Sequence, residues 1–225
     1  MIRVAIGRDL SFSGVPAREA LVPVPDVVVL GEGWGAEDIL RSARAGDLDV
    51  ALIGLDMPGV GALEVLRRAA RFPGVRILLV TAHAQRSYPG SLLRCGAVGH
   101  LTRRGRPAHL IEAVRAAYRG ERYIAPDVAD RVSQSLVDER QRSPFESFSP
   151  RQLQVAVLLA RGCDTGEISR RLHLHAKTVN NHRRQVRARL GISDDAAITQ
   201  LALEHGLLNP PDSTDLGCRS GSCRS

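Results

Sequence analysis

The chain has 225 residues, a net charge of +7 at pH 7 and an isoelectric point near 10. This length leaves room for two domains, and this charge suits a polyanionic partner. No apolar run is long enough to span a membrane and no secretory leader is present, so we expect no membrane contact. The cysteines show no pairing pattern and no His–Cys group has a complete set of zinc ligands, so we expect a reducing compartment, no metal and no other cofactor.

The first half of the chain alternates short apolar runs with helical patterns. Strands are predicted at residues 2–6, 26–30, 50–53, 76–80 and 98–101. Helices are predicted at residues 10–22, 36–45, 62–71, 91–95 and 107–119. Pro16 either starts the first helix late or breaks it. Together these elements predict an α/β doubly wound, parallel, five-stranded sheet of the flavodoxin-like kind.

Such sheets carry their sites at the carboxyl ends of the strands. The residues expected at that edge are Gly7, Arg8, Asp9, Gly54, Thr81 and Arg103.

This half resembles the receiver domain of bacterial response regulators over residues 1–125. The resemblance is carried by residues 49–59, Thr81-Ala, residues 95–101 and residues 118–124. It implies an aspartate at the end of the third strand that accepts a phosphoryl group. It also implies two acids after the first strand that hold Mg²⁺, and a lysine after the fifth strand that pairs with the phosphoryl group.

The residues at those positions do not support that chemistry. Gly54 stands at the nucleophile position and has no side chain to attack phosphorus. Arg8 replaces the first acid, only Asp9 survives, and the larger, planar Arg103 replaces the lysine, while Thr81 is kept. One carboxylate beside two guanidiniums will not hold Mg²⁺. We therefore expect a degenerate receiver pocket with no metal, no enzymatic activity and an output that is independent of phosphorylation.

Four questions remain open for this half. Asp56 could accept the phosphoryl group, but it lies two residues, or about 6 Å, beyond the strand end, whereas in-line transfer needs about 3–3.5 Å. Asp9 could form a structural ion pair with Arg8 and Arg103, or the two arginines could hold an anionic small ligand. His100 is either a hydrogen-bonded wall residue or a responder to pH or ligand. Finally, the whole half could dock a protein that controls DNA binding.

Residues 126–147 are polar and partly helical, as expected of a linker, and residues 209–225 are expected to form a disordered tail. Between them, residues 148–208 predict an all-α domain of four helices. Ser149 is expected to cap the first helix, with Pro150 at its first position and Gly162 beyond its end. Thr165 is expected to cap a second, short helix.

The third helix of this domain is basic and rich in amides. Two helices joined by a short turn, the second with such an outer face, predict a helix-turn-helix that binds double-stranded DNA. Asparagine pairs bidentately with adenine, arginine contacts guanine, and Lys, Thr and His hold phosphates. The alternative is that the arginines form only a solvated helix face.

The run from Phe148 to Leu208 resembles the LuxR/FixJ-type DNA-binding domain. The resemblance is carried by Phe148-Ser-Pro-Arg, Glu167–Leu172, Lys177-Thr-Val-Asn-Asn-His and Arg189-Leu-Gly-Ile. By position it implies base contacts from Asn180, Asn181 and Arg184. It implies phosphate contacts from Lys177, Thr178, His182 and Arg187.

Two further points follow from this resemblance. Most relatives carry a glutamate where this chain has Gln154, so the ion pair of that glutamate is missing here. The last helix, capped by Ser193-Asp-Asp, carries the apolar residues Ala197, Leu201 and Leu208, and it pairs across a two-fold axis in relatives. We therefore expect a homodimer on an inverted repeat. The combined expectation is an atypical response regulator of the NarL/FixJ family, a transcription regulator at the nucleoid in the bacterial cytoplasm.

Overall fold

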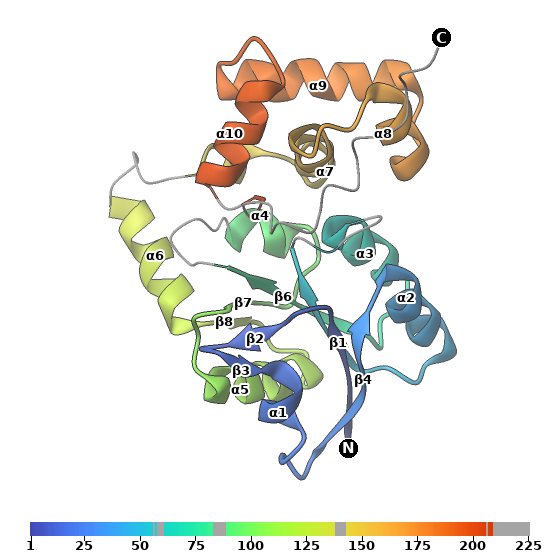
Figure 1. Ribbon diagram of the computed structural model, residues 1–225, viewed down its shortest axis with the longest axis vertical. Helices are drawn as coiled ribbons and strands as arrows, with labels where there is room; N and C mark the ends of the chain where they lie inside the picture. The colour runs from blue at the N-terminus through green and yellow to red at the C-terminus, as the bar shows by residue number, and fades with distance from the viewer. Residues whose placement is uncertain (56, 58–60, 83–88, 138–142, 206, 209–225) are drawn as a thin grey trace.

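Six parallel strands form one sheet in the N-terminal half of the chain (Figure 1). The computed structural model describes residues 1–55, 57, 61–82, 89–137, 143–205 and 207–208. In order across the sheet the strands are β4 (Val27–Trp34), β1 (Ile2–Gly7), β5 (Val50–Gly54), β6 (Arg76–Thr81), β7 (Gly99–Thr102) and β8 (Tyr123–Ile124). The doubly wound sheet is confirmed, but it has one more strand than predicted. β8 pairs with β7, and its two residues are too few to give a periodic sequence pattern.

Helices cover both faces of this sheet and create two apolar cores. One face packs against α1 (Ala17–Leu21) and α5 (Pro107–Tyr118). The other packs against α2 (Ala36–Ala45), α3 (Ala62–Ala69) and α4 (Pro89–Arg94). Beyond β8 the chain forms α6 (Pro126–Val137), which contacts β7. The central strand β5 is buried at every residue, as expected of a parallel strand covered on both sides.

The predicted helix at residues 10–22 is mostly a hairpin. Strands β2 (Ser11–Phe12) and β3 (Val15–Pro16) pair antiparallel, and the helix begins only after Pro16. Ser13 and Gly14 have φ of +48° and +84°, which fits a two-residue hairpin turn with both residues in the left-handed region. Of the two outcomes expected for Pro16, the late start is the one observed.

The C-terminal half is the expected bundle of four helices. They are α7 (Pro150–Ala160), α8 (Thr165–Leu172), α9 (Ala176–Leu190) and α10 (Ala196–Glu204), preceded by the 3₁₀ helix η3 (Pro144–Ser147). None of the helices in the described ranges is long and apolar enough to cross a membrane.

The predicted N-cap of α7 is confirmed, whereas the predicted N-cap of α8 is not. Ser149 and Gln152 cap α7 reciprocally, and Gly162 has a φ of +79° beyond its end, as predicted. The predicted cap of α8 was wrong: Asp164 is the N-cap, and its carboxylate accepts from the Glu167 amide at 2.7 Å. A carboxylate also interacts favourably with the positive end of the helix. The Thr165 hydroxyl is therefore available for another contact.

Helix α7 joins the two halves. Every residue of α7 from Gln152 to Ala160 is buried. The reason is that α7 packs against α9 and α10 on one side and against α3 and α4 on the other (Figure 1). A single apolar core therefore runs from Leu66 and Leu92 in the N-terminal half to Leu158 in the C-terminal half.

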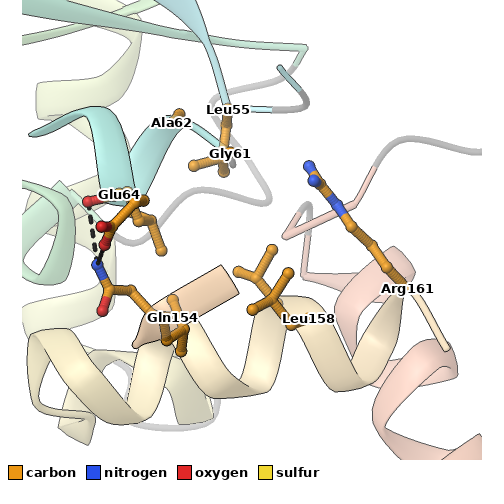
Figure 2. Close-up of a pocket in the computed structure, with 10 residues that line it drawn as sticks. Leu55, Gly61, Ala62, Glu64, Gln154, Leu158 and Arg161 are labelled. Atoms are coloured by element: carbon orange, nitrogen blue, oxygen red, sulfur yellow. Dashed lines mark hydrogen bonds between the residues drawn. The ribbon is translucent and has the colours of Figure 1, made fainter. Parts of the chain in front are cut away.

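Glu64 is the charged centre of this contact. Its side chain is 1% exposed and accepts hydrogen bonds from Arg67 and Arg68 of its own helix. Gln154 reaches across from α7 and donates to Leu63 O at 3.2 Å and to Glu64 Oε2 at 3.3 Å (Figure 2). Burial alone would raise the pKa of Glu64, but the hydrogen bonds from the two arginines outweigh burial and hold the pKa below its usual value.

The crevice beside this contact is too small to hold a ligand. It lies between α3 and α7, next to Gly61, Leu158 and Arg161 (Figure 2). Its volume of about 10 Å³ is room for about one water molecule. The crevice is therefore a packed boundary between the two halves.

Replacement of Gln154 by glutamate tests this contact. Gln154→Glu keeps a partner for Arg151, which donates to the side-chain oxygen of residue 154 at 2.7 Å. It removes both donors to α3 and places a second carboxylate beside Glu64. We expect a loss of about 1–3 kcal/mol in the free energy of unfolding, together with a larger radius of gyration in small-angle X-ray scattering.

The matched control is the exchanged pair Gln154→Glu/Glu64→Gln, which again places one carboxylate and one amide at the boundary. It should recover part of the lost stability, because the two carboxylates no longer face each other, whereas a glutamate at position 154 still cannot donate to Leu63 O. Equal stability and equal radius of gyration in wild type and Gln154→Glu would show that the contact does not hold the halves together.

Candidate nucleic-acid interface and receiver pocket

Helix α9 presents a basic, amide-rich face to solvent. Val179 and Val186 are buried and anchor the inner face of the helix against the bundle. On the outer side, an open hollow of about 690 Å³ is lined by Lys177, Thr178, Asn180, Asn181 and Arg184. The structure thus brings together five of the seven residues that the sequence singled out. There is no acidic residue in the first turn of α9, and the positive helix terminus adds to the attraction for anions.

The other two residues, His182 and Arg187, are held by contacts within the bundle. His182 is half-buried, and burial, followed by the positive charge of Arg151, lowers its pKa. Arg187 donates through Nε to Asp195 Oδ1 at 2.8 Å, and Arg183 also pairs with Asp195. These two arginines therefore fix the start of α10 to α9, a role of Arg183 that the sequence pattern did not indicate.

Both amides of the outer face have hydrogen-bond partners inside the protein. The Thr165 hydroxyl at the start of α8 donates to Asn180 Oδ1 at 3.1 Å. One turn further along α9, Arg184 Nη2 donates to Asn181 Oδ1 at 2.9 Å. Each carboxamide oxygen therefore has a partner within the protein in the absence of a ligand.

The five residues of the receiver pocket lie at one edge of the sheet. Gly54 is buried at the end of β5 and pairs with Val80. Thr81 is buried at the end of β6, and Arg103 is half-buried just after β7. Arg8 and Asp9 follow β1 and are exposed, and Asp9 has a φ of +55°. Gly54 thus lies at the strand end and in the register expected for the nucleophile, but it has no carboxylate.

The alternatives for this pocket differ in outcome. None of the ion pairs among the described residues joins Asp9 to Arg8 or Arg103, so the structure gives no support to the alternative of a structural ion pair. No group of three or more potential metal ligands lies together in the part of the chain that the structure describes. Asp56 lies outside the described residues.

The hairpin fixes the loop that carries Arg103. Ser13 donates from its amide to Arg103 O at 2.7 Å and from its hydroxyl to Arg104 O at 2.9 Å. Phe12, next to it, is fully buried in the core of the α1–α5 face. The backbone after β7 is therefore tied to the backbone after β1.

His100 is a buried, hydrogen-bonded wall residue. It is 0% exposed, and its Nε2 lies 2.9 Å from Thr81 Oγ1 in a hydrogen bond. Burial lowers the pKa of His100 from 6.5 to about 4, although the nearby Asp127 carboxylate opposes the shift. His100 is therefore neutral near pH 7. Of the two interpretations of His100, the geometry supports a hydrogen-bonded wall residue and not a responder to pH or ligand.

This burial predicts a pH-dependent stability. In the unfolded chain His100 takes up a proton below pH 6.5, but in the folded chain it does so only near pH 4, so its contribution to stability is lost as the pH falls from 6.5 to 4. Between pH 7 and pH 5 the loss is about 2 kcal/mol. We expect His100→Gln, which cannot titrate, to lose about 2 kcal/mol less than wild type over this interval in urea unfolding. The exposed-site control His175→Gln should behave as wild type, and an unchanged pH dependence in His100→Gln would refute the assignment.

Comparison with known proteins agrees with both halves. Residues 146–202 match the model of the bacterial regulatory proteins of the luxR family, and residues 24–115 match the response regulator receiver domain. The response regulator UvrY of Escherichia coli K12 is 36% identical over 93% of this chain and 97% of its own. The response regulator GacA of Pseudomonas aeruginosa is 31% identical over 93% of this chain and 99% of its own.

A solved structure shares the fold. RcsB from Salmonella enterica serovar Typhimurium, bound to promoter rprA in the presence of the phosphomimetic BeF3⁻, matches with a TM-score of 0.67 at 22% identity. The match covers 89% of this chain and 98% of that one. Together with the full-length relatives, this places the chain in the family of LuxR-type response regulators: it is a DNA-binding transcription regulator with a receiver domain, and not an enzyme.

Proposed function

We propose that this regulator binds its operator without phosphorylation of the receiver. The observation that carries the proposal is Gly54, which stands at the end of β5 where the family has its phosphoryl-accepting aspartate. A glycine offers no nucleophile, and in-line transfer needs one within about 3–3.5 Å of phosphorus. The degenerate pocket comprises Arg8, Asp9, Gly54, Thr81 and Arg103.

The charges around Gly54 support the same proposal. Arg8 stands in place of a metal-binding acid, so one carboxylate, Asp9, is left beside two arginines. Mg²⁺ takes oxygen ligands and is repelled by the guanidiniums. Without the metal, the pocket lacks the ion that would bridge an acceptor carboxylate and the phosphodonor.

The arrangement of the two halves supports DNA binding without release of the receiver from the DNA-binding domain. Helix α7 contacts the receiver, whereas α9 lies on the far side of α7 from the sheet (Figure 1). The docked receiver therefore leaves the basic face of α9 uncovered. We propose that Asn180, Asn181 and Arg184 contact bases there. Phosphate contacts are assigned to Lys177, Thr178, His182 and Arg187.

We further propose that the protein binds an inverted repeat as a dimer through α10. Ala197 and Leu201 on this helix and Leu208 beyond its end are half-buried, so each keeps apolar surface exposed. A two-fold protein dimer matches a palindromic operator. A solved structure of RcsB contains two RcsB dimers bound to two parallel DNAs, at a TM-score of 0.50 to this chain.

The base and phosphate assignments make different predictions. Arg184→Ala should weaken specific binding by about 1–3 kcal/mol and relax the preference at one base pair. Lys177→Ala should weaken binding to all sequences alike and reduce the salt slope by about one. Titrations of an operator and a scrambled duplex at several salt concentrations separate the two. If both variants lost specific and non-specific binding equally, the assignment would fail.

The proposal that DNA binding is independent of phosphorylation is tested by intact-mass spectrometry. We expect acetyl phosphate with Mg²⁺ to leave both the intact mass and the DNA affinity of the wild type unchanged. A gain of one phosphoryl group that maps to a receiver aspartate, including Asp56, would contradict the proposal.

Two variants serve as controls for this experiment. Gly54→Asp alone should stay unmodified, because Arg8 still occupies the metal site and can pair with the new carboxylate. Gly54→Asp/Arg8→Asp restores both acids and is expected to accept the phosphoryl group.

The dimer is tested by footprinting together with analytical ultracentrifugation at the binding concentration. We expect protection of two half-sites about one helical turn, or 10 base pairs, apart. A single protected half-site bound by a monomer would exclude the two-fold arrangement. Leu201→Arg should reduce the protection to a single half-site, because it places a charge in the apolar surface through which α10 is proposed to form the dimer.

A further inference from the structure

The two carboxamide oxygens on the outer face of α9 accept hydrogen bonds from other residues of the protein. Asn180 Oδ1 accepts from the Thr165 hydroxyl at 3.1 Å, and Asn181 Oδ1 accepts from Arg184 at 2.9 Å. The two branches of a carboxamide point in different directions. With the oxygen of Asn180 aimed at α8, its Nδ2 points away from α8.

The Thr165 hydroxyl is not needed to cap its own helix. Asp164 performs that task through its bond to the Glu167 amide. Thr165 is half-buried at the first helical position, and the hydroxyl contact it makes is with Asn180. Its effect is to orient a side chain on the neighbouring helix.

Two of the other residues around the hollow add donors alone. Lys177 and Arg184 have only donors, and no carboxylate lines the hollow among the described residues. An asparagine that pairs with adenine must accept from the adenine N6 amino group while it donates to N7. Asn180 in its observed orientation offers the donor and withholds the acceptor.

We infer that Thr165 is a positioning residue that sets base preference, and that the base pair facing Asn180 presents acceptors: guanine O6 and N7, or thymine O4, instead of adenine. This inference rests on the proposed contact between α9 and bases. The inference predicts that the operator half-site presents an acceptor-rich edge in the major groove. It replaces the adenine contact that is expected for Asn180 from its residue type alone.

The test is selection of bound duplexes from a randomised pool by the full chain and its variants. Asn180→Ala identifies the relevant base pair as the one whose preference it flattens. At that pair the wild type should favour guanine or thymine over adenine. Thr165→Val, which keeps the shape and removes the donor, frees Asn180 Oδ1 and should shift preference toward adenine about tenfold, within the range of a bidentate pair.

Two controls separate orientation from a structural effect. Thr165→Ser keeps the hydroxyl and should retain the wild-type preference. Ser169→Ala removes a hydroxyl from the same helix that bonds to the Thr165 carbonyl and not to α9, so it should also behave as wild type.

Two outcomes would overturn the inference. A wild-type preference for adenine at that pair overturns the inference even if Thr165→Val does not fold, and so does a folded Thr165→Val that selects the wild-type sequence. Failure of the wild type to select any sequence would instead overturn the proposed function, so the two failures are distinguishable.

Discussion

The hydrogen bonds to the Glu64 carboxylate are the contact on which the arrangement of the two halves depends. A buried charge is tolerated only when partners satisfy it. Arg67 and Arg68 come from the same helix as Glu64, while Gln154 comes from the DNA-binding half. Because Gln154 also donates to the Leu63 carbonyl, the amide fits α3 as a carboxylate would not. Gln154 is thus one of the residues that join the two domains.

This docking determines which face of the DNA-binding domain is exposed. Helix α7 lies between α3 and α4 on one side and α9 and α10 on the other (Figure 1). The basic residues Lys177 and Arg184 of α9 are exposed to solvent. The receiver therefore acts as a support for the domain that binds DNA. The proposed loss of the phosphoryl acceptor at Gly54 is consistent with the exposure of α9 in the docked state. A receiver that does not cover α9 needs no chemical signal to uncover it.

The sequence predicted the features that depend on local periodicity, caps and motif spacing. The alternating strands and helices, the Ser149 cap and the amide-rich face of α9 are all present. Residues 10–22 were less predictable, because a Ser-Gly turn within a helical apolar pattern is a weak signal and Pro16 allowed two outcomes. The cap of α8 was misassigned because Asp164 and Thr165 are both good caps and only their geometry distinguishes them. Contacts between distant residues, such as Gln154 with Glu64 or Thr165 with Asn180, have no local signal and require the fold.

Hydrogen–deuterium exchange of the full-length protein, with and without a selected operator duplex and with no phosphodonor present, tests most directly whether the docked, unphosphorylated chain is the DNA-binding form. Peptides from α9 should gain protection when the duplex is added, while peptides from α3 and α7 should exchange at the same slow rate in both states. If α9 gained no protection until a phosphodonor was supplied, or if exchange in α3 and α7 rose on DNA binding, the receiver would have to be released first, and the proposed mode of action would be wrong.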